Sequence, residues 1–203
     1  MHYEDDLRPF GPVEGGRASH LQTQNQPKLN PTGFGFCTGL EYIHGMRKSI
    51  GVGIIGAGMR GALVLGKRLT ELVGESDLRI AALCESVETR GQEAAELLQG
   101  LYQEKGEDNP IRVFANYKEL VDCEKVDVIL ITTPTHFHLE PTEYALKSGK
   151  KVYLDKPIAV SMEDSKRILK CEEVTGNPLI MGFTRRYEAS WRRCFELLEE
   201  GVI

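Results

Sequence analysis

The sequence of 203 residues lacks the features that mark several classes of protein. It has no excess of positive charge, since 25 Lys and Arg stand against 30 Asp and Glu, and this argues against a surface built to bind nucleic-acid phosphates. No apolar run reaches the length of about 18 residues that a membrane-spanning helix needs. The N-terminus also lacks the apolar centre of a secretory signal. We therefore expect a cytoplasmic protein that binds neither nucleic acid nor membrane.

Cysteines are few and scattered. The sequence has no Cys-x-x-Cys pair and no mixed Cys/His cluster with the spacing of metal ligands. The number of cysteines is odd, which disfavours a framework of disulfides. We predict reduced thiols and no metal site; the five residues are Cys37, Cys84, Cys123, Cys171 and Cys194.

Residues 1–45 differ in character from the rest of the chain. They are rich in Gly, Pro, Gln and Asn and have neither the period of a strand nor that of a helix. Such a segment buries too little apolar surface to offset its ordering entropy. We interpret it as a low-order extension, or an upstream translation, with the functional start at Met46. A docking or targeting tail is the alternative, and its acidic opening argues against targeting.

From residue 50 onward, apolar runs rich in β-formers alternate with helical patterns, as a parallel sheet with crossover helices requires. The strands are almost continuously apolar, which is typical of strands covered on both faces. Right-handed crossovers then favour a doubly wound α/β domain over residues 46–190. The six predicted strands are Ile50–Ile55, Leu78–Cys84, Ile111–Phe114, Val126–Thr132, Lys151–Leu154 and Leu179–Phe183.

The helices are predicted from their apolar spacing and their end signals. Asn116 and Ser161 are expected N-caps, and Gly149 is an expected helix end. In the second helix, Ala94, Ala95, Leu97, Leu98 and Leu101 should face the sheet. The predicted helices are Met59–Val73, Val87–Tyr102, a short one after Asn116, Leu139–Ser148, one after Ser161, and Trp191–Glu199.

The stretch "GVGIIGAGMRG" (residues 51–61) places Gly56, Gly58 and Gly61 between the first strand and the first helix. Gly56 permits a tight turn, Gly58 leaves room for a pyrophosphate against the backbone, and Gly61 lets the helix lie close to the strand. The helix N-terminus then faces the phosphates. Together with Glu85 at the end of the second strand, the pattern predicts a Rossmann-type dinucleotide site that also includes Met59 and Arg60.

Glu85 bears on the choice of dinucleotide. A carboxylate at this place accepts hydrogen bonds from both adenosine ribose hydroxyls and repels a 2′-phosphate, which favours NAD over NADP. Arg60 and Arg90 would offset that repulsion, so NADP stays open. Arg90 either stacks on the adenine or is a solvated helix residue.

Two further motifs follow the fourth and fifth strands. They are Pro134-Thr135-His136-Phe137-His138 and Asp155-Lys156-Pro157. With the glycine loop, Glu85 and "GFTRRYEASW", they make the chain resemble the glucose–fructose oxidoreductase, inositol dehydrogenase and MocA family from about residue 49 to 203. Thr135 stands where that family usually has Asn, and Asp155 where it has Glu. The shorter Asp keeps the charge and is expected to reshape the contact with ribose or with its neighbours.

The resemblance implies roles for individual residues. Lys156 is the implied catalytic residue, which reaches the substrate hydroxyl beside the nicotinamide. Arg186 is expected either to contact cofactor or substrate or to hold the junction between domains by an ion pair. For the two histidines, hydrogen bonding in a loop and helix cap is favoured over metal binding. The implied contacts of the cofactor are Thr132, Thr133, Pro134, His136, His138, Asp155 and Lys156.

The same resemblance implies an NAD(P)-dependent oxidoreductase that moves a hydride between nicotinamide and a sugar, cyclitol or related polyol. Members of the family carry a second α/β domain for the substrate, and residues 191–203 would be only its start. We therefore expect this chain to be incomplete for turnover, and a homo-oligomer when full length. The alternatives are a non-catalytic dinucleotide-binding sensor and an NAD-assisted glycosidase.

Overall fold

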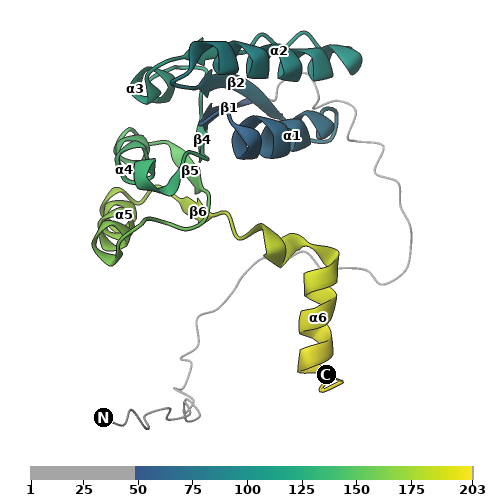
Figure 1. Cartoon of the computed structure of the whole chain (residues 1–203), viewed down its shortest axis with the longest axis vertical. Coiled ribbons are helices and arrows are strands. Elements are labelled where there is room, and N and C mark those ends of the chain that lie inside the picture. Colours follow the sequence, from purple (N-terminus) through teal and green to yellow (C-terminus); the bar gives the residue numbers. More distant parts are fainter. Residues whose placement is uncertain (1–48, 203) are drawn as a thin grey trace, which may run out of the picture. The chain divides into compact units, whose positions relative to one another are not determined.

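The computed structural model describes residues 49–202. The predicted extension 1–45 and the predicted start at Met46 lie outside the described residues. The described chain builds a six-stranded sheet with the order β3-β2-β1-β4-β5-β6 (Figure 1). Each neighbouring pair is parallel, which confirms the doubly wound α/β prediction. The strands are β1 (Ile50–Ile55), β2 (Leu78–Cys84), β3 (Arg112–Phe114), β4 (Val128–Ile131), β5 (Lys151–Leu154) and β6 (Leu179–Met181).

Three strands, β1, β2 and β5, have the predicted bounds, and the other three are shorter than predicted. The fourth begins at Val128 because the N–H of Val126 is taken by the carbonyl of Cys123 in a turn. The sixth ends at Met181 because the N–H of Phe183 bonds back to the Met181 carbonyl. Turns at the strand ends therefore account for the bounds of the fourth and sixth strands.

Helices follow the strands as predicted. The first is less regular than expected, because a π-helical stretch (Met59–Gly66) precedes α1, and the N–H of Lys67 bonds to the carbonyl of Ala62. The α-helices are α1 (Lys67–Glu71), α2 (Glu88–Glu104), α3 (Tyr117–Val121), α4 (Leu139–Lys147), α5 (Met162–Thr175) and α6 (Ala189–Glu199), with 3₁₀ turns at Thr135–Phe137 and Thr184–Tyr187.

The ends of the helices follow the predicted local chemistry. The side chain of Asn116 accepts a hydrogen bond from the N–H of Lys118, and that of Ser161 accepts one from Asp164. Gly149 follows α4 with a φ of +77°, which a residue without a side chain adopts at little cost. These three positions confirm the predicted N-caps and helix end.

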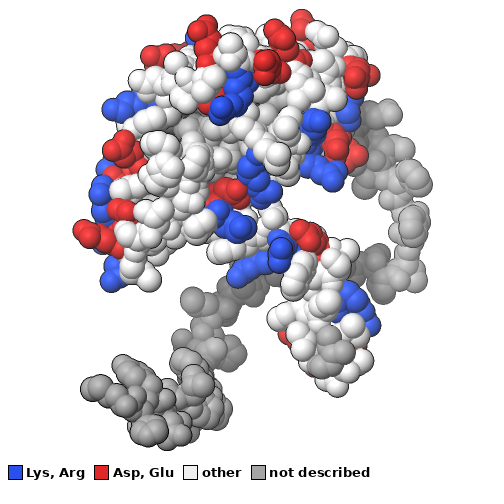
Figure 2. All heavy atoms as spheres, viewed as in Figure 1, with Lys and Arg blue, Asp and Glu red and all other residues white. Residues whose placement is uncertain are grey.

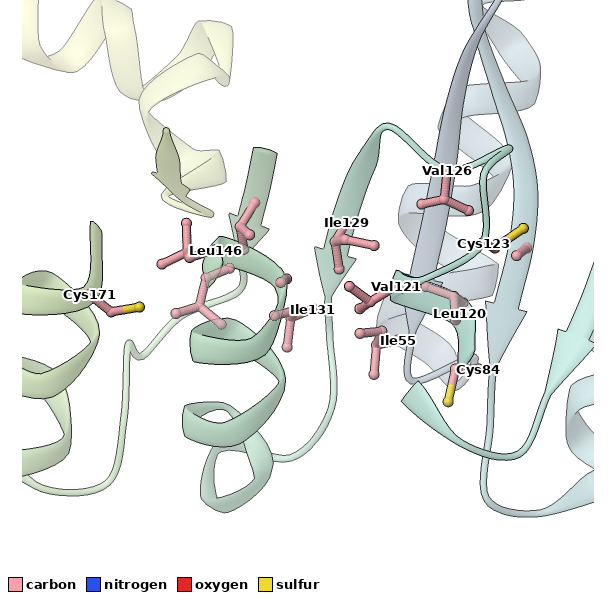
Figure 3. Packing of buried hydrophobic residues seen from close by; sticks show 14 of the residues in the cluster. Ile55, Cys84, Leu120, Val121, Cys123, Val126, Ile129, Ile131, Leu146 and Cys171 are labelled. Carbon is pink, nitrogen blue, oxygen red and sulfur yellow. The ribbon is translucent and has the colours of Figure 1, made fainter. Parts of the chain in front are cut away.

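Successive residues of the central strands point alternately into two separate hydrophobic cores, one on each face of the sheet. Val52 and Ile54 of β1 belong to the core beneath α2, whereas Ile55 faces the core that α3, α4 and α5 cover. In β4, Ile129 and Leu130 divide between the two cores in the same way. Figure 3 shows the second core, with Ile131 of β4 next to Leu146 of α4 and Ile55 of β1 next to Val121 of α3. The nearly continuous apolar strands of the sequence therefore have cover on both faces.

One prediction about α2 is wrong. Leu97 was expected to face the sheet, but it lies on the outer side of the helix and is 37% exposed. Ala94, Ala95 and Leu98 are buried as predicted. Tyr102 extends this buried stripe, and its hydroxyl accepts a hydrogen bond from the N–H of Ile80 at 3.1 Å.

The predicted boundary at residue 190 falls in the first turn of α6 and stays a prediction. The apolar side chains of α6, Trp191, Phe195 and Leu198, are exposed. Within residues 49–202, no helix combines the length and apolar character needed to cross a membrane.

The cysteines of the described chain are free thiols, and three of them contribute to the core. Cys84, Cys123 and Cys171 lie among the aliphatic side chains of the second core (Figure 3), whereas Cys194 is exposed. Burial, with the nearby carboxylates of Glu85 and Glu119, raises the pKa of the Cys84 thiol to about 11.

This raised pKa predicts how Cys84 reacts with iodoacetamide. Since the thiolate is the reactive form, alkylation of Cys84 should rise about tenfold with each unit of pH between about pH 8 and pH 10. Peptide mapping by mass spectrometry measures it, with exposed Cys194 as the internal control. Modification of both thiols at the same rate near pH 8 would contradict the burial of Cys84.

Candidate functional site

A cleft of about 1090 Å³ lies at the carboxyl ends of the parallel strands, where the chain crosses from one half of the sheet to the other. This is the switch point at which doubly wound sheets bind ligands. Acidic and basic side chains are intermingled on the face drawn in Figure 2. Many of the predicted cofactor residues line the cleft together: Gly56, Gly58, Met59, Arg60, Glu85, Arg90, Thr132, Thr133, Pro134, His136 and Asp155.

The glycine loop at the head of the cleft has the geometry that its sequence predicts. Gly56 has a φ of +94°, in the left-handed region that favours glycine. A Cβ on Gly61 would lie 2.1 Å from the Gly56 carbonyl oxygen, so only glycine permits this close approach of helix and strand. A Cβ on Gly58 would meet nothing within 4 Å, so open space lies beside its backbone. The loop is therefore closed beneath and open towards the cleft.

Glu85 follows β2 and is almost completely buried, with its side chain 6% exposed. Its Oε1 accepts hydrogen bonds from the Ser86 hydroxyl and the Val87 N–H, both at 3.2 Å. The Nη1 of Arg90, half-exposed on α2, lies 3.3 Å from the same oxygen. All three contacts end on Oε1, and both arginine and carboxylate line the cleft. Arg90 is therefore an ion-pair partner of Glu85.

The two threonines after β4 differ in what they contact. The hydroxyl of Thr132 donates to the Gly56 carbonyl at 2.8 Å and closes the glycine loop against β4. The hydroxyl oxygen of Thr133 is buried and has no hydrogen-bond partner among the described residues. A buried hydroxyl without a partner is rare and calls for an explanation. At the wall of this cleft, a polar group of a ligand supplies one.

Asp155 forms an ion pair across the cleft. Its two carboxylate oxygens lie 3.0 Å from Nε and 3.2 Å from Nη2 of Arg60, which belongs to the glycine loop. The Tyr153 hydroxyl lies 3.5 Å from the same Nη2. Burial opposes the charge of Arg60, but the contacts with Asp155 outweigh it and raise the pKa of the guanidinium. Asp155, the shorter acid that replaces Glu in the motif, thus binds Arg60 of the glycine loop.

His138 lies beneath the cleft and is 1% exposed. Its Nδ1 is 3.0 Å from the Pro157 carbonyl oxygen, and its Nε2 is 2.9 Å from the Thr133 carbonyl oxygen. These contacts agree with the hydrogen-bonding interpretation of this histidine. His136 is exposed at the rim, where its ring lies 4.1 Å from that of Phe137. Within residues 49–202, no three His, Cys, Asp or Glu side chains gather as a metal site.

Four predicted residues do not line the cleft. Gly61 and His138 are buried beneath it. Lys156 is exposed, between Asp155 and Pro157. The guanidinium of Arg186 lies over the ring of Phe183, 5.0 Å from its centroid, outside the cleft lining.

Sequence reasoning missed several cleft residues. Ser86, Asn116 and Tyr117 line the cleft, and each follows the carboxyl end of a strand. Because the carboxyl ends of parallel strands share one edge of the sheet, the residues after every predicted strand could have been grouped. Tyr153, whose hydroxyl lies 3.5 Å from Arg60, is not a cleft-lining residue, and no sequence signal distinguishes it from a core residue of β5.

The arrangement fits the parts of a dinucleotide. The open cradle at Gly58 suits a pyrophosphate, which helix N-termini bind through backbone N–H groups. The carboxylate of Glu85 suits the hydroxyls of the adenosine ribose. The unpartnered hydroxyl of Thr133, which follows β4 beside the glycine loop, suits a polar group of such a ligand.

Comparisons with known proteins agree with this geometry. Residues 50–183 match the model of the GFO_IDH_MocA family, described as an oxidoreductase family with an NAD-binding Rossmann fold. An inositol 2-dehydrogenase of Salmonella typhimurium is 30% identical over 152 residues, which are 74% of this chain and 42% of that protein. The inositol 2-dehydrogenase 3 of Saccharopolyspora erythraea is 31% identical over 156 residues, 76% of this chain and 42% of that protein.

Solved structures give the same picture. The scyllo-inositol dehydrogenase of Lactobacillus casei, with bound NAD(H) and scyllo-inositol, has a TM-score of 0.62 and 26% identity, covering 77% of this chain and 42% of that one. The chain therefore spans less than half the length of these relatives, and it is their cofactor-binding part that it matches. On the family model and the fold, this chain belongs to the GFO/IDH/MocA oxidoreductase family, with an NAD-binding Rossmann fold.

Proposed function

We propose that the cleft binds NAD and that the chain provides the cofactor half of a polyol dehydrogenase. The observation that carries the proposal is that Gly58 and Glu85, on two neighbouring strand ends, line one cleft. In the proposed complex, Gly58 and the start of the helix hold the pyrophosphate, and Glu85 holds the adenosine ribose. Thr133 directs its unpartnered hydroxyl to the nicotinamide end.

The proposed chemistry is hydride transfer. Bound NAD supplies the hydride acceptor. Lys156 is the proposed catalytic residue: its ammonium stabilises alkoxide character on the substrate oxygen, or its neutral amine accepts the proton that the hydroxyl loses. Lys156 makes no ion pair within the described residues, so its ammonium remains available for a substrate oxygen.

The proposed substrate class is a cyclitol, sugar or related polyol. The relatives named above are inositol dehydrogenases, and the resemblance in sequence extends through the Asp-Lys-Pro motif that precedes α5. Because the chain spans 42% of those relatives, the whole activity is a proposal. A cytoplasmic location and a homo-oligomer when full length stay predictions.

A binding-only role is the second candidate. One observation favours it: Lys156 is exposed and does not line the cleft. A dinucleotide sensor needs the cradle and Glu85 but not the lysine. The two candidates therefore differ in whether loss of Lys156 changes any chemical step.

The first prediction concerns the cradle. Gly58→Ala should lower NAD affinity by about tenfold or more, because the added methyl fills the space proposed for the pyrophosphate. The thermal midpoint should stay unchanged or rise, since the new Cβ meets no atom within 4 Å. Gly100→Ala in α2 is the matched control, since its Cβ also meets nothing. Calorimetric titration measures both, and an unchanged affinity in Gly58→Ala would contradict the site.

The second prediction concerns cofactor choice. Wild type should prefer NAD, and Glu85→Ser should bind NADP about tenfold more tightly than wild type does. In that variant the Ser86 hydroxyl, the Val87 N–H and the Arg90 guanidinium, which now converge on Glu85, are free for a 2′-phosphate. Adding Arg90→Ala should abolish the gain. Equal affinity of wild type for the two cofactors would remove the proposed selectivity.

The third prediction tests the lysine. Lys156→Ala should keep NAD affinity within about twofold and lower inositol-dependent NADH formation by about 100-fold or more. Lys151→Ala, an exposed lysine at the start of β5, is the matched control. NADH absorbance of the full-length protein with a panel of inositols and aldoses gives the rates, because the present chain spans only 42% of its relatives. Equal rates in wild type and Lys156→Ala would reject the catalytic role.

The same assay separates the alternatives. In the full-length protein, tight NAD binding without NADH from any polyol supports the binding-only role. Cleavage of a glycoside with retained NAD and no net NADH supports the NAD-assisted glycosidase.

A further inference from the structure

The segment around Lys156 is anchored on both sides by side chains from other strand ends. On its N-terminal side, the Asp155 N–H donates to the Ile131 carbonyl at 3.0 Å and so ties the segment to β4. The Asp155 carboxylate is then bound at both oxygens by Arg60 of the glycine loop. A bidentate arginine fixes the direction of a carboxylate as well as its place.

On the C-terminal side of Lys156, the anchor is His138. Its Nδ1 lies 3.0 Å from the Pro157 carbonyl oxygen. A neutral imidazole donates to one of its two carbonyl neighbours, and a doubly protonated ring donates to both. Because His138 is 1% exposed, its ring is fixed by packing as well as by these contacts.

Each anchor is also connected to the cleft, Arg60 as a lining residue and His138 through a residue that lines it. Arg60 lines the cleft next to the open backbone of Gly58. His138 contacts the carbonyl of Thr133, whose own hydroxyl is the buried group without a partner. A ligand that fills the cleft therefore touches one anchor directly and the other through a single residue.

We propose that Arg60 and His138 are positioning residues for Lys156. Through them, binding of a dinucleotide in the cleft further orders the segment that carries the lysine. The proposal rests on the proposed function. It explains why Arg60, a cation in the glycine loop where a pyrophosphate is proposed to bind, makes a bidentate contact with Asp155 instead. With Asp155 held by Arg60, the carboxylate beside Lys156 in the chain is already paired, and the ammonium stays free for substrate.

The first test uses amide hydrogen exchange of residues 155–159 in the intact chain. Arg60→Ala and Asp155→Ala should each raise exchange in this segment about fivefold or more, since local opening follows loss of the anchor. The double variant should add little to either single change, because both remove one interaction. Arg60→Lys should recover part of the protection.

Arg79→Ala is the matched control. Arg79 also holds a carboxylate with two nitrogens, at 3.2 and 3.3 Å from Glu107, and lies outside the cleft lining. Its loss should leave exchange at residues 155–159 unchanged. Effects of Arg60→Ala and Asp155→Ala that simply add, or an equal effect of Arg79→Ala, would overturn the proposal for Arg60.

The second test separates positioning from general stability at His138. His138→Gln keeps a donor and should preserve most of the protection of residues 155–159, whereas His138→Ala should raise their exchange about fivefold or more. If the alanine variant does not fold, the glutamine and asparagine variants are compared with each other, since only the longer side chain is expected to reach the Pro157 carbonyl. Equal exchange in the two would overturn the role of His138.

The third test adds NAD. Saturating NAD should slow exchange of residues 155–159 in wild type and in Arg79→Ala, but not in Arg60→Ala with NAD bound to the same degree of saturation. Protection that persists in Arg60→Ala would overturn the transmission. Failure of wild type to bind NAD would instead reject the proposed function, so the two failures are distinguishable.

Discussion

The site depends on the close contact between the glycine loop and the end of β4. The helix after β1 can start where it does only because Gly61 has no Cβ to meet the Gly56 carbonyl oxygen, which would lie 2.1 Å away. Thr132 of the neighbouring loop then donates its hydroxyl to that same carbonyl. One contact thus fixes the direction of the helix, the shape of the loop and the distance between two strand ends. Everything that lines the cleft is placed relative to it.

The charged side chains at the strand ends in the cleft form ion pairs with each other, so they do not depend on a ligand for a partner. Each carboxylate at a strand end has its own arginine: Arg90 beside Glu85, and Arg60 beside Asp155. A buried carboxylate without a partner is costly, and each arginine offsets that cost for its own carboxylate. Both arginines reach their carboxylates from the start of a helix, and both remain partly exposed to the cleft.

Much of the fold could be predicted because strands buried on both faces have a continuous apolar pattern, as in β1 and β5. Short strands such as β6 were harder, since the turn next to the strand decides where it ends. In the site, Gly56, Gly58 and Glu85 follow from backbone sterics and the place of a strand end. The ion pair of Arg60 with Asp155 joins residues 95 positions apart, and no local pattern contains it. Leu97 was misplaced because apolar spacing alone does not fix the rotation of a helix.

The cleft contains two features that a bound ligand would change. One is the open space beside Gly58, and the other is the buried Thr133 hydroxyl without a partner. An unsatisfied buried polar group costs roughly 1–3 kcal/mol, which is a sizeable share of the net stability of a domain. A ligand that fills the space and bonds the hydroxyl removes that cost, so its binding and the stability of the cleft are linked. Thr133 lies against the glycine loop, since a Cβ on Gly56 would be 2.9 Å from the Thr133 nitrogen, and both features line one cleft, so a single ligand reaches both.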